Sequence, residues 1–104
     1  MHRQTKRTSI PPNVKRQVWE RDGGQCVLCH RNDGQPDAHI VARSHGGLGI
    51  PENIGTLCPR CHYRYDQTAE RHMIRAQLEE YITTIYPDWT EEAVTYHKYQ
   101  RRNP

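Results

Sequence analysis

Four cysteines in two Cys-x-x-Cys pairs have the spacing that points most directly to chemistry. The pairs are Cys26/Cys29 and Cys58/Cys61. Each pair places two thiolates on one tight turn, and four converging thiolates are the ligand set that Zn²⁺ prefers at a closed structural site. Disulfides are the competing use, but the N-terminus is polar and basic with no apolar signal region, which indicates a reducing compartment. The sequence therefore predicts a structural zinc ion in a cytoplasmic protein.

Three polar residues lie between or beside these pairs: His39, Asn53 and His62. Hydrolysis of a phosphodiester needs a base to activate water and a cation to stabilise negative charge, and histidine is the natural base near neutral pH. Each residue also has a simpler interpretation, because a His beside a Cys pair often borders the zinc site and Asn is common in turns. The order of all three within the four-cysteine frame favours the functional interpretation.

The segments around these residues form a longer pattern. They read ERDGGQC at 20–26, AHIVARS at 38–44, GG at 46–47, ENI at 52–54 and LCPRCH at 57–62. In this order and spacing they resemble the HNH endonuclease family, whose fold is the ββα-metal or His-Me finger. The resemblance covers residues 14–66, and the tail at 86–92 is similar to small phage- and prophage-encoded members.

The resemblance implies a metal-dependent DNA endonuclease. It assigns the general base to His39, the orientation of that base and the bracing of its loop to Asn53, and a ligand of the catalytic metal to His62. The implied reaction is attack of water on phosphorus, which leaves a 5′-phosphate and a 3′-hydroxyl. The catalytic ion is expected to be a divalent metal such as Mg²⁺, Mn²⁺ or Ni²⁺, among which the sequence does not choose.

One departure from the family pattern concerns the second metal ligand. Many members carry Asp or Glu immediately before the base, where this chain has Ala38, which cannot bind a metal. Asp66 lies four residues after His62, so both side chains share one face of a helix. Asp37 lies two residues before His39. We favour Asp66 as the second ligand, with Asp37 as the alternative.

Charge is spread unevenly along the chain, although the net charge is only +3. Residues 1–64 carry ten Lys/Arg against five Asp/Glu, whereas residues 66–92 carry two against seven. A basic front half suits a polyanion, so Arg3, Lys6 and Arg7 are candidate phosphate contacts. The alternative is a solvated basic terminus.

Arg43, just past the first predicted strand, is a further candidate to clamp a phosphate, since a guanidinium binds phosphate oxygens in a bidentate manner. The expected partner is DNA, contacted mainly through phosphates, and no membrane-spanning run is present. A single site of this kind attacks one strand at a time, so a clean double-strand break would indicate two copies acting together.

The elements that must position these residues belong to one small domain. At 104 residues and a mean hydropathy of −1.05, the chain buries little apolar area and needs a staple such as zinc. We expect an α+β fold with a flexible basic arm at 1–10 and one nuclease domain at 11–104, with its motif core at 26–66 and C-terminal helices at 68–102. Within it we expect a helix from 11 to 23, strands at 38–43 and 54–57, a glycine-rich loop at 44–49 open to a ligand, and helices from 59, 68 and 90.

A different class of function remains open at this point. The chain would then be an inactive, zinc-stapled module that binds DNA or protein, with phage packaging proteins as candidate partners. Ala38 is the best argument for this alternative.

Overall fold

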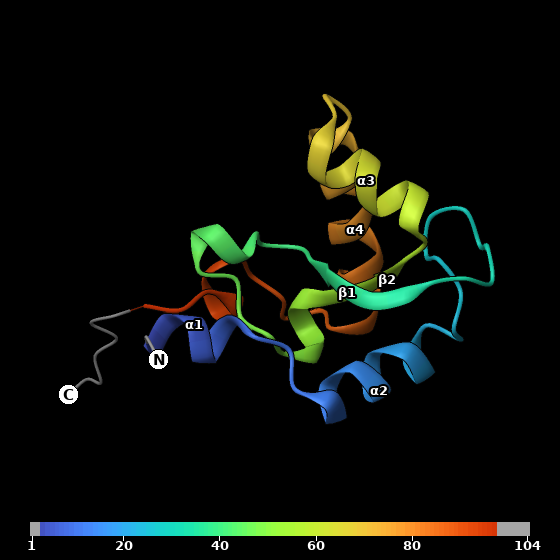
Figure 1. Cartoon of the computed structure of the whole chain (residues 1–104). Coiled ribbons are helices and arrows are strands. Elements are labelled where there is room, and N and C mark those ends of the chain that lie inside the picture. The colour runs from blue at the N-terminus through green and yellow to red at the C-terminus, as the bar shows by residue number, and fades with distance from the viewer. Residues whose placement is uncertain (1–2, 98–104) are drawn as a thin grey trace.

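The computed structural model describes residues 3–97, and at its centre lies a two-stranded antiparallel sheet with helices on both faces (Figure 1). The regular elements, in chain order, are α1 (Arg3–Thr8), α2 (Pro12–Arg21), β1 (Gln35–His39), β2 (Ile54–Leu57), α3 (Pro59–Gln67) and α4 (Arg71–Ile85). Short 3-10 turns span Arg43–His45, Pro51–Asn53 and Glu92–Val94. The expected α+β class is confirmed, with β1, β2 and α3 as its ββα unit.

The sheet is covered on its two faces by different helices. On one face α2 packs Val14 and Val18 against Ile54 of β2. On the other face α4 contributes Ile74, Leu78 and Ile82, which repeat every four residues as its sequence predicts and are fully buried. None of the helices within residues 3–97 is long and apolar enough to cross a membrane.

The turn after α2 ties the sheet to α4. Gly23 and Gly24 take φ values of 71° and 70°, which end the helix as the sequence predicts. The carboxylate of Asp22, held by Arg21, accepts hydrogen bonds from the backbone N–H of Thr56 (3.1 Å) and the hydroxyl of Tyr81 (2.5 Å). These contacts fix both the turn after α2 and helix α4 to β2, the strand that leads into α3.

The first strand is shorter and earlier than predicted. It spans Gln35–His39 and pairs Ala38 with Gly55 and His39 with Ile54. The strand does not continue to residue 43 as predicted, because the N–H and the carbonyl of Val41 are both hydrogen-bonded to the side chain of Asn53 instead of to a neighbouring strand.

Both ends of the described chain also differ from expectation. Residues 3–8 form α1 instead of a flexible arm. Thr90 caps a turn as predicted, its hydroxyl accepting from the N–H of Ala93 (3.0 Å). That turn is a single 3-10 turn instead of a helix, because Thr95 pairs with Gly47 in an isolated bridge. The expected helical residues 98–102 lie outside the described part of the chain.

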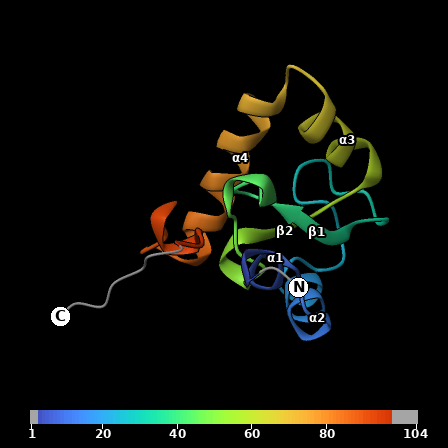
Figure 2. The same cartoon turned by 60° about the vertical axis from the view of Figure 1, so that its left-hand side comes forward.

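The two ends meet over the loop after β1. α1 lies beside the C-terminal turn in both views (Figure 1 and Figure 2), and the guanidinium of Arg7 lies 5.7 Å from the ring centre of Tyr96. Gly47 lies so close to the carbonyl of Val41 that a Cβ there would be 1.8 Å from its oxygen. The glycine-rich loop, expected to be open to a ligand, is therefore packed against its own chain.

Candidate active site and metal centre

The four cysteines converge at one end of the ββα unit. Cys26 and Cys29 lie in the turn after α2, Cys58 caps α3, and Cys61 lies in its first turn. All four sulfur atoms lie within 4.8 Å of one another, with 3.6 Å between Cys29 Sγ and Cys58 Sγ. Tetrahedral zinc with Zn–S bonds of about 2.3 Å separates its sulfurs by about 3.8 Å. The cysteines are free thiols, so the cluster predicted from sequence is confirmed as one that fits a metal such as zinc.

The thiols of this cluster differ in acidity. Burial and the neighbouring cysteines raise the pKa of Cys61 to about 12. Burial also acts to raise the pKa of Cys26, but backbone N–H groups around its sulfur outweigh it and bring that pKa to about 7. Because a metal binds the thiolate form, loading the cluster releases protons, those of Cys29 and Cys61 among them.

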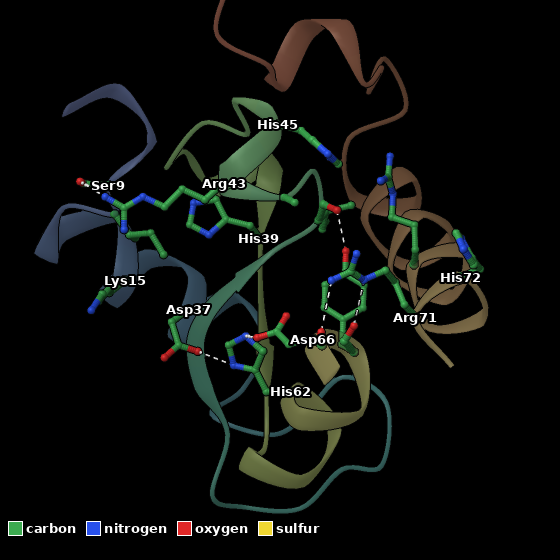
Figure 3. A pocket seen from close by; sticks show the side chains of 15 residues that line it. Ser9, Lys15, Asp37, His39, Arg43, His45, His62, Asp66, Arg71 and His72 are labelled. Atoms are coloured by element: carbon green, nitrogen blue, oxygen red, sulfur yellow. Dashed lines mark hydrogen bonds and ion pairs between the residues drawn. The ribbon is translucent and has the colours of Figure 1, made fainter. Parts of the chain in front are cut away.

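A second group of polar residues lines a pocket of about 680 Å³ between residues 9–15, β1, α3 and the start of α4. Asp37, His39, His62 and Asp66 all contribute to it (Figure 3). Side chains alternate along a strand, so Asp37 and His39 share the pocket face while Ala38, fully buried, packs into the core. The structure thus gives a reason for Ala38: a ligand at that position would face the core and not the pocket.

His62 lies between two carboxylates. Its Nδ1 is 3.4 Å from Asp37 Oδ1 and its Nε2 is 3.2 Å from Asp66 Oδ2. The contact with Asp37 raises the pKa of His62 against the opposing effect of burial, and Asp66 adds to the rise. The same contact, with a smaller contribution from Lys15, lowers the pKa of Asp37. Both candidate acids therefore lie beside His62, and the choice between them stays a prediction.

The donor set fits a divalent ion. Asp37 Oδ1 is buried, yet its contact with His62 lacks the geometry of a hydrogen bond. An oxygen of this kind has capacity left for a cation. One imidazole nitrogen with two carboxylate oxygens is a mixture that several divalent metals accept.

The hydrogen bond of His39 defines which of its ring nitrogens carries the proton. Its Nε2 lies 2.8 Å from the carbonyl oxygen of Thr8. A carbonyl only accepts, so Nε2 must carry the hydrogen and Nδ1 holds the lone pair. Burial lowers the pKa of His39 below its ordinary value, which keeps the ring neutral near pH 7. A neutral imidazole with a free Nδ1 is the form that a general base requires.

Asn53 is fully buried and braces the loop, as the resemblance implies. Its Oδ1 accepts from Val41 N (2.8 Å), and its Nδ2 donates to the carbonyls of Val41 (3.2 Å) and Leu48 (2.9 Å). The hydrogen bonds found among residues 3–97 do not join its side chain to His39. Asn53 therefore holds the backbone that follows β1, and its role in orienting His39 stays a prediction.

The basic residues at the pocket only partly match the sequence-based candidates. Arg43 lines the pocket, with its Nη2 donating to Ser9 Oγ (2.7 Å). Lys6 and Arg7 are exposed and do not line it, and the side chain of Arg3 lies outside what the structure describes.

Three other Lys or Arg side chains also line the pocket: Lys15, Arg71 and Arg75. Lys15 belongs to the basic front half of the sequence, whereas sequence reasoning missed the two arginines of α4. Arg71 and Arg75 are four residues apart on α4, which places them on one face, but the acidic balance of residues 66–92 concealed that signal. Arg75 is also paired with Glu79 (2.6 Å) and Glu91 (2.9 Å).

Comparison with known proteins gives two matches. A family model described as HNH endonuclease matches residues 26–68, a range that contains all four cysteines, His39, Asn53 and His62. The chain is similar to Anaredoxin from Nostoc sp., with 33% identity over 53 residues, which are 50% of this chain and 70% of that protein. No solved structure matches the chain.

Proposed function

The chain belongs to the HNH endonuclease family, and from this premise we propose that it is a metal-dependent nuclease that hydrolyses phosphodiester bonds of DNA. One observation carries the proposal. A neutral histidine, whose Nδ1 makes no hydrogen bond within residues 3–97, shares a pocket with a histidine flanked by two carboxylates, and basic side chains line the same pocket. A base, a metal-binding group and phosphate contacts are the three parts that such hydrolysis needs.

In the proposed reaction, His39 removes the proton from the attacking water at Nδ1. The Thr8 carbonyl holds the opposite side of the ring through Nε2–H and stabilises the imidazolium that forms. Arg43, at the mouth of the same pocket, binds an oxygen of the phosphate. Cleavage leaves a 5′-phosphate and a 3′-hydroxyl.

The two proposed metal sites have different roles. His62, with Asp66 and Asp37, would hold the divalent ion at the pocket. Bound there, Mg²⁺, Mn²⁺ or Ni²⁺ would supply a Lewis acid for the charge on the phosphate and the leaving oxygen. The four cysteines would hold zinc as a structural ion, at the start of the helix that carries His62.

The proposed substrate is duplex DNA, gripped through its phosphates. Lys15, Arg43 and Arg71 give the pocket a positive lining, and contacts from such side chains to phosphates carry no direct sequence information. Little sequence preference is therefore expected. A second copy of the chain, or packaging proteins of a phage, are further partners that the sequence suggested.

The alternative function is a zinc-stapled binding module without catalysis. Its main argument was Ala38, but that side chain packs in the core while Asp37 stands on the pocket face. Ala38 therefore does not argue for loss of a ligand.

The test is cleavage of supercoiled plasmid by the purified protein with and without Mg²⁺, Mn²⁺ or Ni²⁺. We expect metal-dependent conversion to open circles or linear DNA, abolished in His39→Ala and retained in His97→Ala, whose exposed ring lies outside the pocket. Zinc content should be equal in all three proteins. No conversion with any metal at full zinc occupancy would favour the binding module.

A further inference from the structure

Residues 6–10, which we call the N-terminal strap, contact two residues of the pocket. The carbonyl of Thr8 accepts from His39 Nε2 (2.8 Å), and the hydroxyl of Thr8 lies 3.2 Å from Arg43 Nε. The hydroxyl of Ser9 lies 2.7 Å from Arg43 Nη2. Figure 3 shows Ser9 beside Arg43 at the pocket. One short segment thus contacts both the proposed base and the proposed phosphate ligand.

We infer that the N-terminal strap is a positioning element of the active site: its backbone fixes the proton of His39 on Nε2, and its hydroxyls aim Arg43. The inference rests on the proposed function, because it concerns the residues given the roles of base and phosphate ligand. It assigns to this segment a role different from the DNA contacts predicted for Lys6 and Arg7, whose side chains do not line the pocket.

No group within residues 26–68, the range that the family model matches, replaces Thr8 as the hydrogen-bond partner of the His39 ring. Across residues 3–97, its hydrogen bonds go to the Thr8 carbonyl alone. The family model begins at residue 26, so the strap lies outside the segment that carries the motif. A fixed position of the His39 ring and its proton matters because a misplaced base lowers the rate of cleavage by orders of magnitude.

The N-terminal strap packs against the loop after β1. The N–H of Gly49 donates to the carbonyl of Arg7 (3.1 Å), and Thr8 is only 2% exposed. A Cβ on Gly49 would lie 1.9 Å from the carbonyl oxygen of Ser9 and 2.6 Å from its carbon. Gly49 is not among the glycines with positive φ. Glycine is therefore needed there because the strap packs so closely against it, and not because of its backbone conformation.

Gly49→Ala therefore tests the strap without changing any residue that touches the pocket. The matched control is Gly55→Ala, a buried glycine of β2 whose added Cβ would meet only Leu78 at an ordinary 3.7 Å. We expect Gly49→Ala to keep its zinc and lower kcat for plasmid cleavage about 100-fold, whereas Gly55→Ala keeps the wild-type kcat. A folded Gly49→Ala protein with wild-type kcat would overturn the inference.

A spectroscopic measurement separates this inference from the proposed function. In protein with ¹⁵N-labelled histidine, the Nε2 proton of His39 should be protected from exchange with water and give its own NMR signal, assigned by its loss in His39→Gln. Gly49→Ala should lose this signal and Gly55→Ala should keep it. If the wild-type protein cuts no DNA, the proposed function fails while this signal still tests the strap. Absence of the signal from the wild type would overturn the strap.

Ser9→Ala tests the second half of the inference and decides it even if Gly49→Ala does not fold. Loss of one hydrogen bond of ordinary strength to Arg43 should raise KM for DNA about fivefold with kcat unchanged. An unchanged KM would overturn the inference that the Ser9 hydroxyl aims Arg43.

Discussion

His39 and His62 line the same pocket but have opposite electrostatic surroundings. Burial lowers the pKa of His39, whereas Asp37 and Asp66 raise that of His62. A base works when it has lost its proton, and a ligand binds metal in the same deprotonated form. Deprotonation of His39 should therefore set the lower pH limit for base catalysis, and deprotonation of His62 should set a higher pH limit for metal binding.

The first prediction follows from these signs. At saturating metal, kcat should rise with pH and level off below the ordinary histidine pKa of about 6.5, since His39 is neutral early. The metal concentration for half-maximal rate should continue to fall up to a pH above that value, as His62 loses its proton. Plasmid nicking measured across pH and metal concentration checks both. A kcat that still rises well above pH 6.5 at saturating metal would contradict His39 as the base.

The second prediction distinguishes the two acids beside His62. Because the contact with Asp37 is the largest cause of the raised pKa of His62, Asp37→Asn should lower that pKa, as followed by NMR titration. It should also weaken Mn²⁺ binding about tenfold or more, the scale seen when groups around a metal are removed. Asp33→Asn, on an exposed acid paired with Arg31, is the control and should change neither. Unchanged Mn²⁺ affinity in Asp37→Asn would leave Asp66 as the carboxylate ligand.

At the level of residues, the sequence predicted which side chains could bind a metal. It did not predict which way the side chains of β1 face. The cysteine spacing predicted the cluster that the structure forms. Which of Ala38 and Asp37 faces the pocket depends on where β1 begins and ends. The predicted strand began at residue 38, three residues after the observed start at Gln35. The proton position on His39 depends on a backbone carbonyl 31 residues away in sequence, a contact that no local pattern encodes.

At the level of elements, the loop between β1 and β2 depends on one buried amide. Asn53→Ala would leave the N–H of Val41 and the carbonyls of Val41 and Leu48 without their partner. Unpaired buried groups are costly, so the free energy of unfolding should fall by about 3 kcal/mol. Urea unfolding measures this loss, and kcat should fall because the loop carries Arg43 and continues from His39. Asn32→Ala, at an exposed side chain bonded to Gln25, is the control and should change stability little.

Element prediction succeeded where local signals agree with packing. Prolines begin α2, paired glycines end it, and the apolar spacing of α4 matches its buried face. It failed where distant segments compete for the backbone. The C-terminal helix predicted from Thr90 is cut short because Leu48 N bonds to Val94 O (2.8 Å) and Tyr96 N to Gly46 O (2.7 Å).

At the level of the whole molecule, the two ends of the described chain and the four-cysteine cluster help hold together a protein with a small core. The segment from Asp22 to Gly34 has no helix or strand. It is attached by few backbone bonds, such as Val27 N to Thr56 O (3.0 Å), and by the cysteines that bring it to α3. A zinc ion bound by these cysteines would contribute about 10 kcal/mol or more, which matches the whole stability of a typical domain.

Removal of that ion should therefore unfold the protein. We expect a strong chelator, with reductant present to keep the thiols free, to abolish cooperative thermal unfolding and plasmid cleavage together, as followed by circular dichroism and a nicking assay. Zinc added back should restore cooperative unfolding, and zinc together with Mg²⁺ should restore cleavage as well. Mg²⁺ alone should restore neither, because hard oxygen-seeking ions bind thiolates poorly. His62 directly follows Cys61 on α3, so loss of the cluster also releases the helix that holds the proposed catalytic ion. A protein that keeps its melting temperature after mass spectrometry shows the zinc gone would contradict this dependence and place the stability in the core around α4.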